Sequence, residues 1–211
     1  MPNKIKNVKT LAESKFLNMY DVEYTNKLKN TKRWTVASRR SPVAFERNLL
    51  KRDVQKQSDA VIIAPYHVDE KKFVLIKQFR VPINDYVYEL PAGLIETDEE
   101  MVECVKRELK EETGLKLLEI HLDNTFRHIY ASAGMTDETM DIVYCTCSGT
   151  VSLEHLEEDE DIEVVMVDAD EAKALILSRP VIDVKALLVL QHYALGGFAI
   201  FTNKTFSINE K

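Results

Sequence analysis

The sequence predicts an α+β protein whose strands pair mainly as hairpins and are covered by a few helices. Short runs rich in Val, Ile and Phe are separated by polar turns of a few residues, which is typical of hairpins. Helical patterns follow these runs irregularly, so the regular strand–helix alternation of a doubly wound parallel sheet is not expected. The 211 residues suffice for one well-filled domain, or one domain with a small appended layer.

Residues 1–57 are expected to form an N-terminal extension built on a β-hairpin. The runs at 16–24 and 33–40 flank the polar turn KNTK, and this pattern predicts two paired strands. A short helix is expected around 44–50. The main domain is expected to occupy residues 58–211.

The main domain opens with two β-rich runs that predict a buried hairpin, AVIIAPYHV and FVLIKQFRV, joined by the turn DEKK. VYELPAG follows as a third short strand that ends in a loop. The apolar run ALLVLQHYAL predicts a buried helix ended by Gly196 and Gly197. In chain order, the remaining pattern predicts a helix at 98–113, strands near 117–121, 126–131, 139–147 and 162–167, and helices near 169–178 and 184–195.

Composition excludes several classes of protein. The net charge of −7 argues against general nucleic-acid binding, which needs a basic face. No apolar run approaches the roughly 18 residues of a membrane span, and the N-terminus has no apolar core typical of a secretory signal. Cys145 and Cys147 alternate along a predicted strand, so together with Cys104 they predict packed thiols and not a zinc site. A reducing, cytoplasmic location is therefore expected.

The helix predicted at 98–113 has marked ends. Thr97, with Glu100 three residues later, matches a capping box, so Thr97 is the expected N-cap. Gly114 fits the left-handed position that follows a helix. A well-bounded helix allows its side chains to be placed by angle.

Carboxylates occupy an unusual side of this helix. At 100° per residue, the following apolar residues share one side and should face the core: Met101, Val102, Val105 and Leu109. Glu108 and Glu112 project into this arc or to its edge, with Glu111 beside them. Converging, partly desolvated acids are tolerated when a cation lies between them, and oxygen ligands favour Mg²⁺ or Mn²⁺. The alternative is a solvated acidic stripe on a surface helix.

The flanking residues make the segment 93–115 resemble the Nudix box, G-x5-E-x7-R-E-U-x-E-E-x-G-U, where U is aliphatic. Every fixed position is matched, by Gly93, Glu99, Arg107, Glu108, Leu109, Glu111, Glu112, Gly114 and Leu115. At a usage of roughly 7% per residue type, seven fixed letters match by chance on the order of 10⁻⁸ times per start. The resemblance is therefore specific.

The resemblance implies a Nudix fold, in which a mixed sheet lies between helices, and hydrolysis of a diphosphate bond. It implies Mg²⁺ as cofactor, with Mn²⁺ as a possible substitute. The implied metal ligands are the carboxylates of Glu108 and Glu112, the supporting carboxylate of Glu111 and the carbonyl of Ala92. Glu99 and Arg107 match positions that brace the loop through a salt bridge.

Segments outside the box resemble the ADP-ribose pyrophosphatase branch of this family: QFR at 78–80, ELPAG at 89–93 and EDIEV at 160–164. The N-terminal pattern with Trp34 and Arg39 does so too. This branch implies a homodimer whose N-terminal strands cross to the partner, and a small nucleotide-sugar substrate. ADP-ribose, cut to AMP and ribose 5-phosphate, is the first expectation.

The same resemblance implies roles for individual side chains. Trp34 would stack the base, and Arg39 and Arg80 would hold phosphate or the terminal sugar, which suits a flat ring and guanidinium groups. Glu160 would act on the attacking water with the catalytic Glu108 and Glu112. Glu89 and Glu138 are the further expected substrate contacts, and Glu138 is also a second candidate for acting on the water. Trp34 could instead anchor a core or a dimer interface, and Glu160 could lie in a solvated loop.

The chain departs from this branch at one loop. Ser132, Ala133 and Gly134 stand where members often have Ser-Pro-Gly, and the proline is associated with ADP-ribose specificity. GDP-mannose and UDP-sugars therefore stay open as substrates. A non-catalytic sensor on a Nudix domain is a further alternative, and an isoprenoid-type isomerase is disfavoured. None of the five histidines lies in a motif, so covalent catalysis is not expected.

Overall fold

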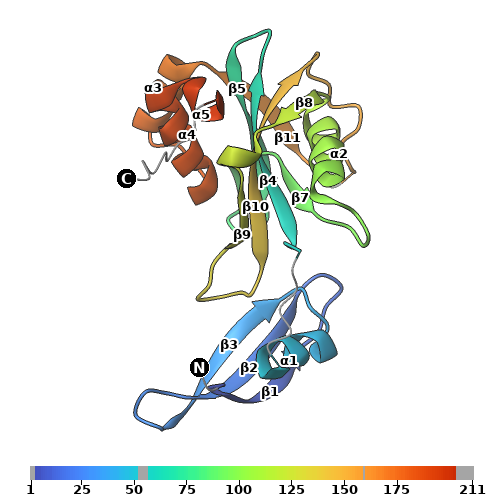
Figure 1. The fold of residues 1–211 in the computed structure, drawn as a ribbon, viewed down its shortest axis with the longest axis vertical. Helices are drawn as coiled ribbons and strands as arrows, with labels where there is room; N and C mark the ends of the chain where they lie inside the picture. Colours follow the sequence, from blue (N-terminus) through green and yellow to red (C-terminus); the bar gives the residue numbers. More distant parts are fainter. Residues whose placement is uncertain (1–2, 52–56, 159, 203–211) are drawn as a thin grey trace, which may run out of the picture. The chain divides into compact units, whose positions relative to one another are not determined.

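The computed structural model describes residues 3–51, 57–158 and 160–202, and the chain divides into two compact units. Unit 1 comprises Met1–Asp59 with His128–Met140, and unit 2 comprises Ala60–Arg127 with Asp141–Lys211. Within the described part of the chain, every helix is too short or too polar to cross a membrane. Each unit has its own sheet (Figure 1).

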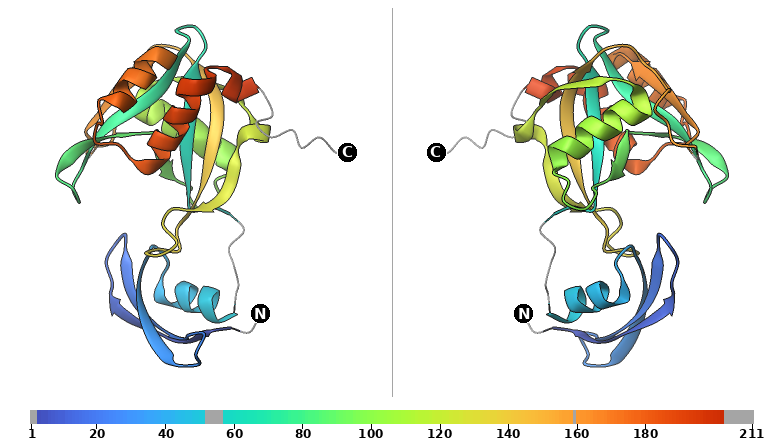
Figure 2. Two further views of the ribbon diagram at one scale, coloured as in Figure 1. Left: turned by 90° about the vertical axis from the view of Figure 1, so that its left-hand side faces the viewer. Right: turned by 90° about the vertical axis from the view of Figure 1, so that its right-hand side faces the viewer.

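Unit 1 is a three-stranded antiparallel sheet with one helix on it. Its elements are β1 (Ile5–Ala12), β2 (Asn18–Thr25), β3 (Thr31–Ser38) and α1 (Pro42–Lys51). Phe45 of α1 stacks on Tyr20 of β2 with ring centroids 4.1 Å apart, and both side chains are fully buried. Both views in Figure 2 show α1 lying along one face of this sheet.

The predicted N-terminal hairpin is confirmed, since β2 and β3 pair in register from Asn18↔Ser38 to Thr25↔Thr31. The short helix is confirmed as α1. Strand β1 was not predicted, because Ile5 and Val8, which both pack on the core beside Tyr20, are three residues apart and do not alternate; a register shift lies between Ile5 and Asn7. It pairs with β2, the next strand along the chain, and a second register shift lies between Thr10 and Ala12.

Unit 2 contains a mixed sheet with helices on both faces. Its elements are β4 (Ala60–His67), β5 (Lys72–Arg80), β6 (Asp85–Glu89), β7 (Ala92–Leu94), α2 (Met101–Thr113), β8 (Lys116–Ile120), a 3₁₀ turn (Leu122–Asn124), β9 (Phe126–Tyr130), β10 (Thr139–Ser148), β11 (Ile162–Val167), α3 (Ala169–Leu177), α4 (Val184–Gly196) and α5 (Ala199–Thr202). The last three residues of β9 and the first two of β10 belong to unit 1. The strand order is β11-β5-β4-β10-β8, with β6 on β5, β7 on β4 and β9 on β10. The Asp59 N–H donates to the Thr139 carbonyl, and the Val68 N–H donates to the Cys147 carbonyl. Residue numbers therefore rise together along β4 and β10, and the two strands run parallel.

Alternation along the strands divides the core of unit 2 between the two faces of the sheet. Val61 and Ile63 of β4 join the cluster under α2, together with Cys145 and Cys147 of β10. On the other face, Tyr66 of β4 contacts the aromatic rings of α4 and α5. Figure 1 shows α2 on one side of the sheet and α3, α4 and α5 on the other. The predictions of a mixed sheet between helices and of packed cysteines are confirmed.

Helix α2 ends as predicted but begins later. Gly114 is its C-cap, with φ 74°, and its N–H donates to Lys110. The predicted N-cap at Thr97 is wrong: the helix begins at Met101, and Glu100 is an N-cap without a side-chain hydrogen bond. The loop before the helix makes other hydrogen bonds: the Glu99 carboxylate accepts from the Glu96 N–H and from Arg107.

Two further expectations about this region are corrected. Val102 is 45% exposed and does not face the core; the buried face of α2 instead carries Cys104, Glu108 and Glu112. The run VYELPAG is two strands, β6 and β7, interrupted at Leu90 and Pro91. Proline has no N–H for a ladder, while its carbonyl accepts from Ile63.

Candidate active site

Two carboxylates of α2 are buried on the face that packs against the sheet. The exposed fraction is 8% for Glu108 and 3% for Glu112. They lie one turn apart, next to Leu109, so the same amphipathic arc that buries leucine also buries the acids. The solvated-stripe alternative is therefore wrong for these two residues.

The loop before α2 contacts both acids. The Ala92 N–H donates to Glu112 Oε2 at 2.9 Å. A Cβ on Gly93 would lie 1.7 Å from Glu108 Oε1, so only glycine leaves room for this carboxylate. The backbone at 92–93 and the two acids thus form one cluster, which we call the acid cluster.

Arg107 ties the loop to the helix. Its Nε and Nη2 both donate to the Glu99 carboxylate at 2.9 Å, and Nη2 also donates to the Leu94 carbonyl at 3.1 Å. Its Nη1 donates to Glu108 at 2.6 Å and to Glu111 at 3.1 Å. The salt bridge between Glu99 and Arg107 is present, and it braces the loop against the acid cluster.

Burial sets the protonation of these acids in the metal-free protein. Desolvation raises the pKa of Glu108 to about 7, against the lowering effect of Arg107. Desolvation also raises the pKa of Glu112 well above its ordinary value, and the charges of Glu108 and Glu160 add to this. Ionised carboxylates in such positions are stable only when positive charge lies beside them.

The donor atoms at the acid cluster are of one chemical type. Glu108, Glu111 and Glu112 offer carboxylate oxygens and Ala92 a carbonyl oxygen, which suits a hard divalent cation. Within the described residues, no three acidic, His or Cys side chains are grouped closely enough to hold an ion in their present rotamers. Glu108 and Glu111 are instead bonded to Arg107. The residues fit Mg²⁺ by their oxygen donors and by the burial of Glu108 and Glu112.

Three more predicted site residues belong to unit 2. The charge of Glu160 acts on both Glu108 and Glu112, and its side chain accepts from the Glu157 N–H. Arg80 and Glu89 form a two-bond pair, with Nε–Oε1 2.8 Å and Nη2–Oε2 2.6 Å. The charge of Glu112 also acts on Arg80, so this pair is electrostatically linked to the acid cluster.

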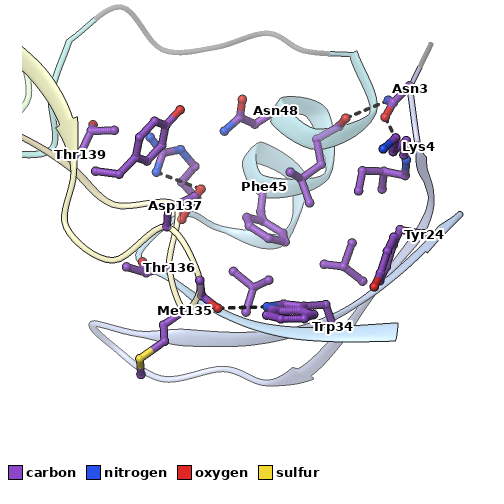
Figure 3. A pocket seen from close by; sticks show the side chains of 18 of the residues that line it. Asn3, Lys4, Tyr24, Trp34, Phe45, Asn48, Met135, Thr136, Asp137 and Thr139 are labelled. Carbon is purple, nitrogen blue, oxygen red and sulfur yellow. Dashed lines mark hydrogen bonds and ion pairs between the residues drawn. The ribbon is translucent and has the colours of Figure 1, made fainter. Parts of the chain in front are cut away.

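The other three predicted residues lie together in unit 1. The loop between β9 and β10, residues 131–138, contains Glu138. The Trp34 indole N–H donates to Gly134 O of this loop at 3.0 Å. Arg39 pairs with Glu138 at 2.6 Å. Trp34, Phe45 and Tyr130 are among the walls of a largely apolar pocket of about 830 Å³ (Figure 3).

One buried ion cluster was missed by sequence reasoning. Arg40 lies between Asp59, at 3.1 Å, and Asp137, at 3.2 Å, and it is only 12% exposed. Its carbonyl accepts from Asn18 and Tyr20. The one signal in the sequence was the pair of arginines at 39–40, together with Asp59 just before β4 and Asp137 shortly before β10.

Protonation of Glu99 is expected to weaken the fold. Hydrogen bonds from Arg107 lower the pKa of Glu99 to about 2, from 4.5, so this carboxylate stabilises the fold at neutral pH. The contribution is lost as the pH falls from about 4.5 towards 2. Glu99→Gln should lose about 1–2 kcal/mol of unfolding free energy at neutral pH, and should show a weaker acid dependence. Urea unfolding at a series of pH values checks this, and equal acid slopes for both proteins would contradict it.

The sequence of the chain resembles those of known proteins. The profile of the NUDIX domain matches residues 56–185, which is more than half of the chain. The chain is 35% identical over 149 residues to the ADP-ribose pyrophosphatase of Bacillus subtilis (strain 168), covering 69% of this chain and 77% of that one. It is 29% identical over 160 residues to the GDP-mannose pyrophosphatase of Enterobacter sp. (strain 638), covering 70% and 79%.

A solved structure shares the fold. The crystal structure of an ADP compounds hydrolase superposes with a TM-score of 0.64 at 18% identity, covering 91% of this chain and 94% of that one. The region matched by the domain profile contains the whole acid cluster, Arg80, Glu89 and Glu160. Trp34 and Arg39 precede it.

Proposed function

The chain belongs to the Nudix family of hydrolases, and on that premise we propose that it hydrolyses the diphosphate bridge of a nucleoside diphosphate-linked sugar. ADP-ribose is the first candidate substrate, and AMP and ribose 5-phosphate would be its products. The similarity to an ADP-ribose pyrophosphatase and a GDP-mannose pyrophosphatase supports this substrate class.

The observation that carries the proposal is the burial of Glu108 and Glu112 against the backbone of Ala92 and Gly93. A sequence selected for stability alone would not place two acids there, since burial disfavours their ionised form. We assign these carboxylates, with Glu111 and the Ala92 carbonyl, as ligands of Mg²⁺. The bound ion would neutralise phosphate oxygens and lower the pKa of an attacking water.

Glu160 is assigned as the base. Its carboxylate is close enough to the acid cluster to influence the pKa of both buried glutamates. It would accept a proton from water as the water oxygen bonds to one phosphorus and the bridging oxygen leaves with the other phosphate. Glu160 lies on the short segment before β11. Its side chain accepts a hydrogen bond from the Glu157 N–H, and this bond supports the assignment.

Arg80 is assigned to the phosphates. Its guanidinium is oriented by two bonds to Glu89, which leaves an N–H edge for a phosphate oxygen. Glu89 is proposed to contact the substrate as well. The hydrogen bonds with Glu89 raise the pKa of Arg80, and the negative charges of Glu112 and Asp183 add to this effect, so Arg80 stays cationic.

The residues of unit 1 are assigned to substrate recognition. Trp34 is 53% exposed and presents an aromatic face in the pocket of unit 1, which suits a nucleobase. Arg39 and Glu138 are proposed to contact the substrate. We further propose a homodimer, in which residues 1–57 form the extension that meets the partner, and a cytoplasmic location.

A hydrolysis panel tests the proposal. ADP-ribose, GDP-mannose and a UDP-sugar are each incubated with enzyme and Mg²⁺, and products are separated by chromatography. One substrate should exceed the others in kcat/KM by at least about tenfold, and a chelator should lower its rate at least about 100-fold. GDP-mannose as the preferred substrate would replace ADP-ribose and keep the mechanism.

The panel also separates the enzyme from a sensor. Tight binding of a nucleotide sugar without product release, in the presence of Mg²⁺, would contradict the proposal and favour a non-catalytic role. Release that is unaffected by chelator would contradict the metal assignment alone.

A further inference from the structure

The loop 131–138 is closed on itself by backbone bonds. Met135 N donates to Ser132 O at 2.8 Å and Thr136 N to the same oxygen at 3.0 Å. Ala131 N donates to Glu138 O at 3.0 Å, which closes the base of the loop. These bonds define a turn whose second residue is Ala133, but none of them fixes the turn to the sheet of unit 1.

Bonds from strand β3 and from the two arginines after it fasten this loop. The Ala37 N–H donates to Met135 O at 2.9 Å, Arg39 pairs with Glu138 at 2.6 Å, and Arg40 pairs with Asp137 at 3.2 Å. The indole N–H of Trp34 donates to Gly134 O at 3.0 Å. Figure 3 shows this bond as a dashed line from Trp34, with the ring lying along the pocket wall. Among the bonds of the described residues, only that of Trp34 holds Gly134, the third residue of the turn.

Side-chain packing contributes little to holding the tip of the loop, residues 133–135, in place. A Cβ at Gly134 would meet nothing within 4 Å, and Met135 is 69% exposed. Ala133 is exposed as well. Apolar burial therefore cannot fix the tip, and its position depends on hydrogen bonds.

We propose that Trp34 is a positioning residue, whose indole N–H holds Gly134 and with it the tip of the loop that carries Glu138. A proline at the second position of the turn would restrict the same loop through its fixed φ, and this chain has Ala133 there. A single hydrogen bond and a single proline stabilise a loop to a similar degree. The indole N–H thus restricts the loop as a proline could, and the ring face stays available for the proposed contact with the base.

The proposal deepens the proposed function, since Glu138 and the base-binding face belong to it, but its first test needs no substrate. Trp34→Phe keeps an aromatic face and removes the donor. Hydrogen exchange of the free protein then reports the loop: the Ala37, Met135 and Thr136 amides should exchange at least about fivefold faster. Tyr20 and Val22 in the buried strand β2 should keep their rates and serve as the internal reference.

A second substitution makes the test specific. Ala133→Pro is compatible with the turn, because Ala133 N–H donates to none of the described residues and proline is favoured at this position. Added to Trp34→Phe, it should return the loop amides to within about twofold of the parent rates. Tyr24→Phe, which changes another aromatic wall of the same pocket, is the matched control and should leave loop exchange unchanged.

The outcomes separate the proposal from the proposed function. Unchanged loop exchange in Trp34→Phe would overturn the positioning role, as would faster exchange that extends into β2 or that proline does not reverse. If the panel identifies a substrate, kcat/KM of Trp34→Phe should fall about fivefold or more and recover with Ala133→Pro. A chain that hydrolyses no nucleotide sugar would contradict the proposed function, while the exchange data would still decide the role of Trp34.

Discussion

Replacing Glu112 by glutamine is expected to lower kcat at least about 100-fold while the fold is kept. The glutamine carbonyl can still accept from the Ala92 N–H, so the loop contact survives. The variant loses the anionic oxygen that the proposed Mg²⁺ site requires. Steady-state kinetics on the preferred substrate at saturating Mg²⁺ measures the effect.

The same substitution is expected not to lower stability. Burial raises the pKa of Glu112, so in the metal-free protein its ionised form destabilises the fold at neutral and higher pH. Removing that charge should therefore leave Tm equal or higher when it is measured in chelator. Glu103→Gln, the same change on the exposed side of α2, is the control and should alter neither value much. Near-normal turnover of Glu112→Gln would remove Glu112 from the mechanism.

Replacing Gly93 by alanine is expected to lower kcat about 100-fold with little change in stability. The new Cβ would lie 1.7 Å from Glu108 Oε1 and 2.5 Å from Oε2, so the carboxylate must move. The end of a glutamate side chain moves at little cost in folding energy, whereas a displacement of about 1 Å at a catalytic group costs about 100-fold in rate. Kinetics and thermal unfolding on one preparation measure both effects.

Gly114→Ala gives the opposite pattern and serves as its control. Gly114 has φ 74°, and a Cβ there would meet the backbone N of Ser152 at 2.6 Å, which has no freedom to withdraw. We expect a loss of about 2 kcal/mol or more, or about 4–8 °C in Tm, and near-normal kcat below that temperature. Full activity in Gly93→Ala would show that Glu108 is not needed where it lies.

Sequence reasoning succeeded where local geometry decides. The angular position of Glu108 and Glu112 on α2 follows from 3.6 residues per turn, and the helix end at Gly114 follows from its left-handed backbone. The β2–β3 hairpin follows from its alternation and polar turn. These features need no knowledge of distant residues.

It failed where contacts beyond the local pattern decide. The predicted capping box of Thr97 and Glu100 is absent: Glu99, between them, is bonded to Arg107 eight residues later, and the helix begins at Met101. Strand β1 was missed because register shifts break its alternation. The bond between Trp34 and Gly134 joins residues a hundred positions apart, and the resemblance to a family could suggest an aromatic face but not a donor.

The direct measurement is anomalous scattering from crystals soaked in Mn²⁺, with the protein otherwise unchanged. We expect an anomalous peak within bonding distance of Glu108 and Glu112 carboxylate oxygens, with these side chains turned towards it. Well-ordered glutamates with no peak beside them, or manganese bound only elsewhere, would contradict a role for these two acids as ligands.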